Sequence, residues 1–281
     1  MVGSINLDFV ASAPRLPRAG ETVTGATLAR HPGGKGANQA LAAQRLIKGR
    51  PVGEVCLIGR VGRDAMAEEA MALLLADDVD ISAVVTDAGA PTGVALIAVD
   101  PEGENQIVVA AGANHRAMPE QLPARIETSL ILQLELPVET VEAAVGRATE
   151  FVCVNLAPAA PVSDQLLRRA DLLIVNETEA EFYGDLLHRG GGRVVVTQGA
   201  RGAVMYQHGT EIARAMPPKV RAVDATGAGD CFVGAICVAL LEGMEPEAAL
   251  RFACAAGAIA ATRPGAQPSM PWRDEVESLI G

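Results

Sequence analysis

Short apolar runs alternate with helical runs along most of this 281-residue chain, and this alternation limits the fold more than any other feature. Wholly apolar strands separated by helices are typical of a parallel sheet that helices cover on both faces. No low-complexity linker interrupts the pattern, so we expect one α/β domain over residues 1–281. The expected strands are 54–59, 129–134, 151–155, 172–176 and 193–198, and the expected helices are 64–76, 138–148, 163–170, 177–187, 230–242 and 246–262.

Two segments, 20–30 and 92–114, break the alternation and are typical of β-ribbons. The second is expected to be a hairpin that turns at Pro101–Asn105. Both alternating faces of 94–99 are apolar, so a small sheet built from this segment needs cover on both sides. A ligand beneath the sheet and a partner subunit above it would supply that cover, and we therefore expect a homodimer.

Composition excludes several classes of function. The net charge is −11 and only 3% of residues are aromatic, which argues against a nucleic-acid partner. The five cysteines include no CxxC pair and the four histidines no HxxxH pair, so buried thiols in a reducing cytoplasm are expected rather than disulfides or zinc. Neither a signal peptide nor a long uncharged apolar span is found, so a cytoplasmic protein without membrane segments is expected.

The stretch VDATGAGDCFVGA (223–235) places Asp224 and Asp230 around small residues, directly before an apolar helix. One interpretation is a tight loop in which an aspartate caps the helix. The other is an anion site, where free amides at the helix start face a phosphate and Asp230 faces a reacting hydroxyl. The stretch by itself favours the second interpretation only slightly.

A second glycine-rich stretch, HPGGKGANQALAAQRL (31–46), runs from a loop into a helix. It is not a phosphate-binding P-loop, because the GxxxxGK spacing is absent and no Ser or Thr follows Lys35. The chain also lacks GxGxxG after a strand, which excludes a dinucleotide fold. Lys35 and Asn38 are candidate polar contacts to a ligand, although a plain helix-entry turn explains the stretch about as well.

Taken together, these motifs resemble the ribokinase-like (PfkB) family of sugar and nucleoside kinases. The matching stretches follow the family's order over nearly the whole chain. GAGD alone is typical of the broad family, whereas GSINLD, GGKGANQA and GAQPS together are typical of its ribose kinases. The matches are GSINLD (3–8), GETVTG (20–25), GGKGANQA (33–40), TGVALI (92–97), GEN (103–105), AGAN (111–114), QLELP (133–137), NETEAE (176–181), VDATGAGDCF (223–232) and GAQPSMPW (265–272).

The resemblance implies a central, mostly parallel sheet with a small β-sheet lid formed by 9–30 and 89–112. It implies ATP-dependent phosphorylation of D-ribose at its 5-hydroxyl. Asp230 is then the general base, and the amides of Gly227, Ala228 and Gly229 form an anion hole, which suits the charge that phosphoryl transfer spreads over oxygen atoms. The implied sugar-binding residues are Asn6, Asp8, Gly34, Lys35, Asn38 and Glu135, together with Asp230.

Asp8 is expected just after the first strand and Glu135 at the end of 129–134, where parallel strands bind ligands. The residues implied for ATP are Asn176, Glu179, Thr197, Gly199, Arg201, Gly202, Gly229 and Cys254. Asn176 and Glu179 also help to organise Mg²⁺ through water in the family, although NETE equally fits a helix cap. The resemblance adds a K⁺ site formed by Asp224, Thr226, Ala260, Arg263, Gly265 and Ser269.

The sequence departs from the family's pattern in four places. It begins at MVGS, so most of the usual first strand is expected to be missing, and the stretch between Glu181 and Arg193 is short. NLAPA (155–159) replaces the more usual NPAPA, and Cys254 stands where a polar residue is common. Two other functions stay open: a kinase of the same family for another sugar or a nucleoside, or a non-catalytic sugar-binding protein.

Overall fold

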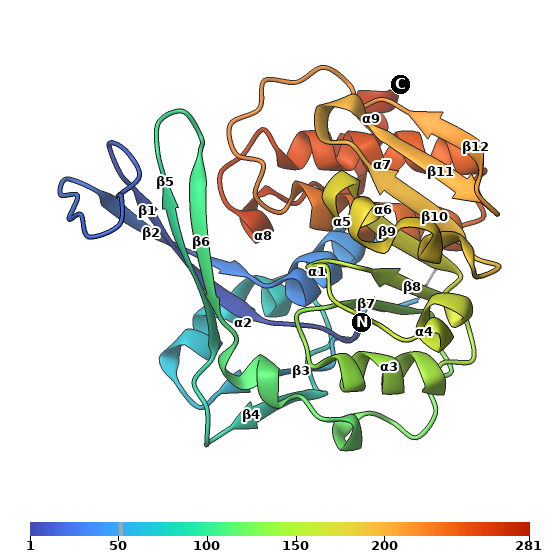
Figure 1. Ribbon diagram of the computed structural model, residues 1–281, viewed down its shortest axis with the longest axis horizontal. Coiled ribbons are helices and arrows are strands. Elements are labelled where there is room, and N and C mark those ends of the chain that lie inside the picture. The colour runs from blue at the N-terminus through green and yellow to red at the C-terminus, as the bar shows by residue number, and fades with distance from the viewer. Residues whose placement is uncertain (51–52) are drawn as a thin grey trace.

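The computed structural model describes residues 1–50 and 53–281, and a six-stranded sheet forms its centre (Figure 1). The strand order is β12-β11-β10-β9-β8-β7. β7 to β10 are parallel, whereas β11 and β12 form an antiparallel hairpin at one edge. The predicted, mostly parallel sheet is thus confirmed. Its strands are β7 (Leu130–Gln133), β8 (Val152–Asn155), β9 (Leu172–Asn176), β10 (Arg193–Thr197), β11 (Ala203–Gln207) and β12 (Thr210–Ala215).

Helices cover both faces of this sheet because its strands are apolar on both sides. In β9, Leu172 and Ile174 enter the core beneath α1, α6 and α7, whereas Leu173 and Val175 enter the core beneath α3 and α4. Within residues 1–50 and 53–281, no helix combines the length and apolar character needed to cross a membrane. The helices are α1 (Lys35–Ile47), α2 (Ala65–Ala76), α3 (Val138–Arg147), α4 (Asp164–Arg169), α5 (Glu177–Tyr183), α6 (Ala228–Leu241), α7 (Pro246–Ala260), α8 (Ala266–Ser269) and α9 (Arg273–Ile280).

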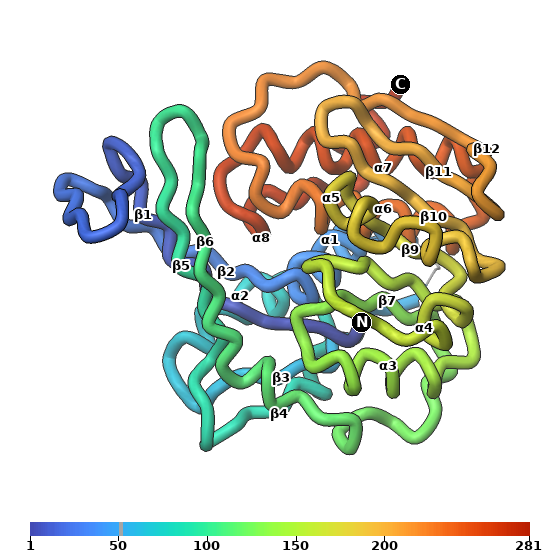
Figure 2. The backbone as a smooth tube through the Cα atoms, in the orientation of Figure 1, coloured from blue at the N-terminus to red at the C-terminus, as the bar shows by residue number. Residues whose placement is uncertain are grey.

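A four-stranded sheet of order β2-β1-β5-β6 stands beside the main body, at the left of Figure 1. β5 and β6 form the predicted hairpin, with its turn at Asp100–Glu104. Figure 2 shows that this turn and the β1–β2 connection both project away from the chain termini. The strands are β1 (Asn6–Ser12), β2 (Thr27–Gly33), β5 (Gly93–Val99) and β6 (Asn105–Ala110), and a separate parallel pair is formed by β3 (Gly59–Gly62) and β4 (Val84–Asp87).

Several element predictions need correction. Only 27–30 of the ribbon expected at 20–30 is strand. The strand expected at 54–59 is displaced to β3, and Cys56 and Ile58 form only single bridges. The helix expected over 177–187 ends at Tyr183, because Gly184 adopts φ +52 and a 3-10 turn follows over Gly184–His188.

Asp8 does not follow the first strand but lies inside β1. This strand pairs with β2 and β5 from Asn6 onward, so it continues past residue 8. Before β1, Val2 forms isolated parallel bridges with Leu132 of β7 and with Ile58, so this segment lies at the edge of the main sheet. The β11–β12 hairpin, α8 and α9 are elements that the sequence analysis did not predict.

The start of α1 lies directly against the backbone of the N-terminal segment. A Cβ at Gly36 would lie 2.4–2.5 Å from backbone atoms of Gly3 and Ser4. We predict that Gly36→Ala lowers the free energy of unfolding by about 1–3 kcal/mol, because the methyl group must push these segments apart. Urea unfolding measures this change.

Gly146 in α3 provides the matched control, since a Cβ there would meet nothing within 4 Å. Gly146→Ala should stabilise the protein by up to about 1 kcal/mol through helix propensity alone. Unchanged stability of Gly36→Ala would contradict the close packing.

Candidate active site

The N-terminus of α6 presents free backbone donors. Its N-cap, Gly227, adopts φ +77, a conformation that favours glycine. The amide of Ala228 donates to the carbonyl of Ala225 at 3.1 Å. Among the described residues, the amides of Gly227 and Gly229 have no hydrogen-bond acceptor, and a Cβ at Gly229 would meet nothing within 4 Å. This loop can therefore accept an anion close to its backbone.

Asp230 lies in the first turn of α6, and two amide side chains from α1 hold its carboxylate. Asn38 Nδ2 donates to one carboxylate oxygen at 2.9 Å, and Gln39 Nε2 donates to the other at 3.0 Å. The Asp230 side chain is buried, and no cation forms a salt bridge with it in the described parts of the chain. Its negative charge is thus stabilised by neutral donors at short range.

Two further carboxylates, Asp8 and Glu135, lie near Asp230. Burial raises the pKa of Asp8, the charges of Glu135 and Asp230 add to this effect, and the pKa reaches about 7. Lys35 opposes this effect, and the charge of Asp230 raises the pKa of Lys35 despite its burial. The site therefore concentrates negative charge around one lysine, which is costly without a ligand.

Contacts to the N-terminal segment and to the start of α1 position Glu135 and Gly34. Glu135 accepts hydrogen bonds from Ser4 Oγ at 2.5 Å and from the Lys35 amide at 3.0 Å, so it is anchored at the start of α1. Gly34 is the N-cap of α1 with φ +87, and it lies against the backbone of Asn6. The structure thus brings Asn6, Gly34, Lys35 and Glu135 to one end of the helix.

The Asn6 amide is oriented by Asn114, a buried residue that the sequence analysis did not single out. Asn114 Oδ1 accepts from the backbone amide of Ile5, so its Nδ2 must face the other way. That nitrogen donates to the Ile5 carbonyl and to Asn6 Oδ1 at 2.7 Å. Asn6 is therefore left with its NH₂ group as the donor available to a ligand.

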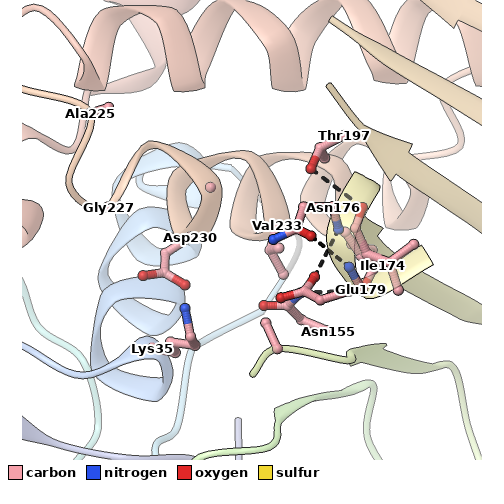
Figure 3. A pocket seen from close by; sticks show the side chains of 13 residues that line it. Lys35, Asn155, Ile174, Asn176, Glu179, Thr197, Ala225, Gly227, Asp230 and Val233 are labelled. Atoms are coloured by element: carbon pink, nitrogen blue, oxygen red, sulfur yellow. Dashed lines mark hydrogen bonds between the residues drawn. The ribbon is translucent and has the colours of Figure 1, made fainter. Parts of the chain in front are cut away.

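A pocket of about 250 Å³ adjoins this cluster, and Lys35 and Asp230 belong to its wall (Figure 3). In Figure 3 the side chains of Lys35 and Asp230 point toward each other, at the opposite end of the pocket from Asn176, Glu179 and Thr197. The full lining is Lys35, Asn155, Ala157, Ile174, Val175, Asn176, Glu179, Thr197, Ala225, Gly227, Gly229, Asp230 and Val233.

Four of the residues implied for ATP, Asn176, Glu179, Thr197 and Gly229, thus line the pocket, and the first two form a helix cap as well. Asn176 Oδ1 accepts from the Glu179 amide, and Glu179 Oε2 accepts from the Asn176 amide. Burial raises the pKa of Glu179. Capping and ligand binding are compatible here, because both side chains still face the pocket.

Four other residues implied for ATP are not in the pocket wall. Arg201 is mostly exposed, and its Nη2 atom donates to both carboxylate oxygens of Glu177 at 2.5 Å. Gly199 and Gly202 flank it in the turn after β10. Cys254 is buried, its thiol donates to the Ala215 carbonyl at 3.8 Å, and burial raises its pKa to about 11.

The residues implied for K⁺ lie where loop 223–226 meets the end of α7. Asp224 accepts hydrogen bonds from the amides of Thr226 and Gly265, both at 2.8 Å, and these lower its pKa against the effect of burial. Ser269 donates to the Ala266 carbonyl, and the Ala260 carbonyl accepts from the Arg263 amide. Asp224 thus joins loop 223–226 to Gly265, and its carboxylate, with nearby carbonyl and hydroxyl oxygens, is a kind of donor set that suits a monovalent cation.

Residues 1–50 and 53–281 contain no group of three or more His, Cys, Asp or Glu side chains able to hold a metal ion. The acidic groups that face the pocket are Glu179 and Asp230, at its two ends. This arrangement fits Mg²⁺ only as an ion carried mainly by phosphate oxygens and water, with side chains in the outer shell.

Comparisons with known proteins agree with the fold. The family model for pfkB carbohydrate kinases matches residues 1–273. The ribokinase of Haemophilus influenzae is 37% identical, and the alignment covers 100% of this chain and 97% of that protein. The ribokinase of Bacillus subtilis is 36% identical, with 100% and 98% covered. The chain belongs to the pfkB family of carbohydrate kinases.

Solved structures give the same result. The ribokinase of Thermotoga maritima has a TM-score of 0.89 at 32% identity, covering 99% of this chain and 97% of that one. The Arabidopsis thaliana ribokinase complexed with ribose and ATP has a TM-score of 0.82 at 30% identity, with 99% and 97% covered. The predicted family, fold class and class of enzyme are confirmed.

The raised pKa of Asp8 predicts a dependence of stability on pH. Between about pH 4 and 7 the folded protein holds this proton more tightly than the unfolded chain, so stability decreases as pH rises through that range. Asp8→Asn removes the ionisation. We expect it to raise the melting temperature by more at pH 8 than at pH 5, as differential scanning calorimetry would measure.

Asp185→Asn, a change at an exposed carboxylate, serves as the control and should shift the melting temperature equally at both pH values. If Asp8→Asn raised the melting temperature equally at pH 5 and pH 8, burial would not suppress the charge of Asp8.

Proposed function

We propose that this chain transfers the γ-phosphoryl group of ATP to the 5-hydroxyl of D-ribose, giving D-ribose 5-phosphate. The observation that carries the proposal is the position of Asp230, between the pocket and the polar cluster around α1. Ribokinase relatives at 36–37% identity over the full chain, and a solved ribokinase complexed with ribose and ATP, support the substrates.

In this proposal Asp230 is the general base. Its carboxylate takes the proton of the sugar hydroxyl while that oxygen attacks the γ-phosphorus atom and the bond to ADP breaks. The negative charge of Asp230 suits this step, and its hydrogen bonds from Asn38 and Gln39 fix its direction. The free amides of Gly227 and Gly229, with the positive end of the α6 dipole, stabilise the charge on the transferring group.

ATP is proposed to lie along the pocket wall formed by Asn176, Glu179 and Thr197, with its adenine toward Gly199–Gly202 and Cys254. The Lys35 ammonium lies beside Asp230 at the opposite end of the pocket. Its positive charge offsets the negative charge of the phosphates and carboxylates. Mg²⁺, when bound, neutralises phosphate charge, and Asn176 and Glu179 would hold its water ligands.

Ribose is proposed to bind in the polar cluster. The free Asn6 NH₂ group donates to a hydroxyl, while Asp8 and Glu135 accept from hydroxyls. The small sheet, with 9–30 and 89–112 as its lid segments, would cover the sugar with Ala95 and Ile97, which share the face of Asp8 by register.

A substrate panel tests the proposed function. Purified protein with ATP and Mg²⁺ should phosphorylate D-ribose with a kcat/KM well above that for fructose or adenosine. Sites that bind a hydroxyl group reject analogues lacking it by up to about 10⁴-fold. A coupled ADP-release assay with mass spectrometry of the product measures both rate and identity.

Asp230→Asn is the control for the mechanism. It should lower kcat by about 10²–10⁴-fold while ribose and ATP still bind. A panel in which adenosine or fructose reacts faster than ribose would overturn the substrate, and a normal kcat in Asp230→Asn would overturn the role of the base.

The second proposed cofactor is K⁺, held by oxygens of Asp224, Thr226, Ala260, Arg263, Gly265 and Ser269. Asp224 already joins loop 223–226 to Gly265 by hydrogen bonds. A bound cation would hold the loop that leads into Gly227 more firmly, without touching the substrate.

We predict that K⁺ raises kcat several-fold over Na⁺ at equal ionic strength, because ordering of the loop acts on the transition state. Asp224→Ala should abolish the difference between the two salts, and the ratio of kcat in potassium to kcat in sodium buffer is the measurement. Equal rates of the wild-type enzyme in both salts would leave this site without a role.

The last proposed partner is a second copy of the chain, bound to the outer face of the small sheet. On this face Leu28, Leu96 and Val108 are 67%, 51% and 65% exposed. The strand registers place all three on the face of Phe9, opposite to Asp8. Exposed apolar side chains gathered in this way are typical of an interface.

We predict that Leu96→Asp converts a dimer to a monomer, since it would bury an unpaired charge. Ile107→Asp on the same hairpin is the matched control. Ile107 pairs with Ile97 on the opposite face, so the dimer should persist. Light scattering at micromolar concentration measures the mass, and a monomeric wild-type protein would overturn the interface.

A further inference from the structure

The proposed base is one end of a buried chain of amide side chains that runs back to the central sheet. Gln39, Gln133 and Asn155 form this amide chain, and the first two are completely buried. Gln39 Nε2 donates to Asp230 Oδ1 at 3.0 Å and to Asn155 Oδ1 at 3.1 Å. Gln133 Nε2 donates to Gln39 Oε1 at 2.9 Å. Every polar atom of Gln39 is thus paired.

The direction of every hydrogen bond in the amide chain follows from one backbone group. The carbonyl of Ile174 can only accept, so Asn155 must turn its Nδ2 toward it, at 3.2 Å. Asn155 Oδ1 then needs a donor, which fixes Nε2 of Gln39 on that side. The second N–H of the same nitrogen is left for Asp230. Strand β9 therefore determines that Asp230 receives a donor rather than an acceptor.

This arrangement fixes the orientation of the carboxylate. Each oxygen of Asp230 has one amide donor, Gln39 or Asn38, so rotation of the carboxylate would break both hydrogen bonds. An apolar side chain of equal size at residue 39 would fill the space without holding the carboxylate.

We propose that Gln39 is a positioning residue that holds the Asp230 carboxylate in one orientation, and that Gln133 and Asn155 act through Gln39. This rests on the proposed function, in which Asp230 is the base. Asn155 and Ile174 also belong to the wall of the pocket that Asp230 lines, so the amide chain connects the base to that wall.

Gln39→Met tests the proposal because it keeps the length of the side chain and removes its donor. We expect kcat to fall about 10- to 100-fold, because a catalytic group misplaced by a fraction of an ångström transfers a proton less efficiently. The KM values for ribose and for ATP should change less than about threefold. Gln133→Met, which removes the donor to Gln39 Oε1 together with the contact to Met1 Sδ, should lower kcat by less.

Gln44→Met is the matched control, since Gln44 lies on the same helix but donates to the Asp78 carbonyl. It should leave kcat and both KM values unchanged. Thermal unfolding identifies a variant that fails to fold, in which case Gln133→Met carries the test. A folded Gln39→Met with wild-type kcat would overturn the proposal and leave the amide chain a structural feature.

A ligand-free crystal structure of Gln39→Met separates this proposal from the proposed function. We expect Asp230 to leave its single orientation in that structure, whatever the substrate proves to be. An unmoved Asp230 carboxylate would overturn the positioning role. A wild-type enzyme that does not phosphorylate ribose would instead overturn the proposed function, and the structural result would still stand.

Discussion

The close packing of α1 on α6 determines the geometry of the whole site. Gly234 of α6 faces Ala42, Ala43 and the backbone of Gln39 in α1, and a Cβ at this glycine would come within 3.0 Å of all three. Helices normally pack with their axes 8–10 Å apart, and small side chains allow the shorter end of that range. At this separation the amides of Asn38 and Gln39 reach the carboxylate of Asp230. Larger residues at the contact would leave the carboxylate buried without donors.

The same compactness makes the site electrostatically unfavourable in the absence of ligands. Asp8, Glu135 and Asp230 approach one another with Lys35 as the nearby cation, and the pKa of Asp8 near 7 reflects this. The free protein is less stable because these charged groups are buried close together, as is common at functional sites. A sugar that donates hydroxyl hydrogens to these oxygens reduces the electrostatic repulsion, so ligand binding and protein stability are coupled through the same three carboxylates.

Much of the fold could be predicted because its strands are short, apolar and separated by helices. The glycine motifs also located the α6 terminus and the start of α1 correctly. The β11–β12 hairpin was not predicted, because antiparallel strands joined by a tight turn do not follow the alternation of strands and helices. Its turn lies at His208 and Gly209, which both adopt positive φ. The role of Gln39 could not be predicted from the sequence. A glutamine that follows Asn38 on a helix is expected at the surface, and only the packing of α1 against α6, β7 and β8 shows that it is buried and paired.

Strand β1 belongs to both parts of the molecule, and this has a mechanical consequence. It begins at Asn6 in the polar cluster and continues without interruption to Ser12 in the small sheet, paired on both sides throughout. A paired strand is stiff, so a tilt of the small sheet must carry Asn6 and Asp8 with it. Asn6 and Asp8, the proposed sugar-binding residues, therefore lie near one end of a stiff strand whose other end belongs to the cover. A sugar that displaced Asp8 would displace the far end of β1 by a larger distance.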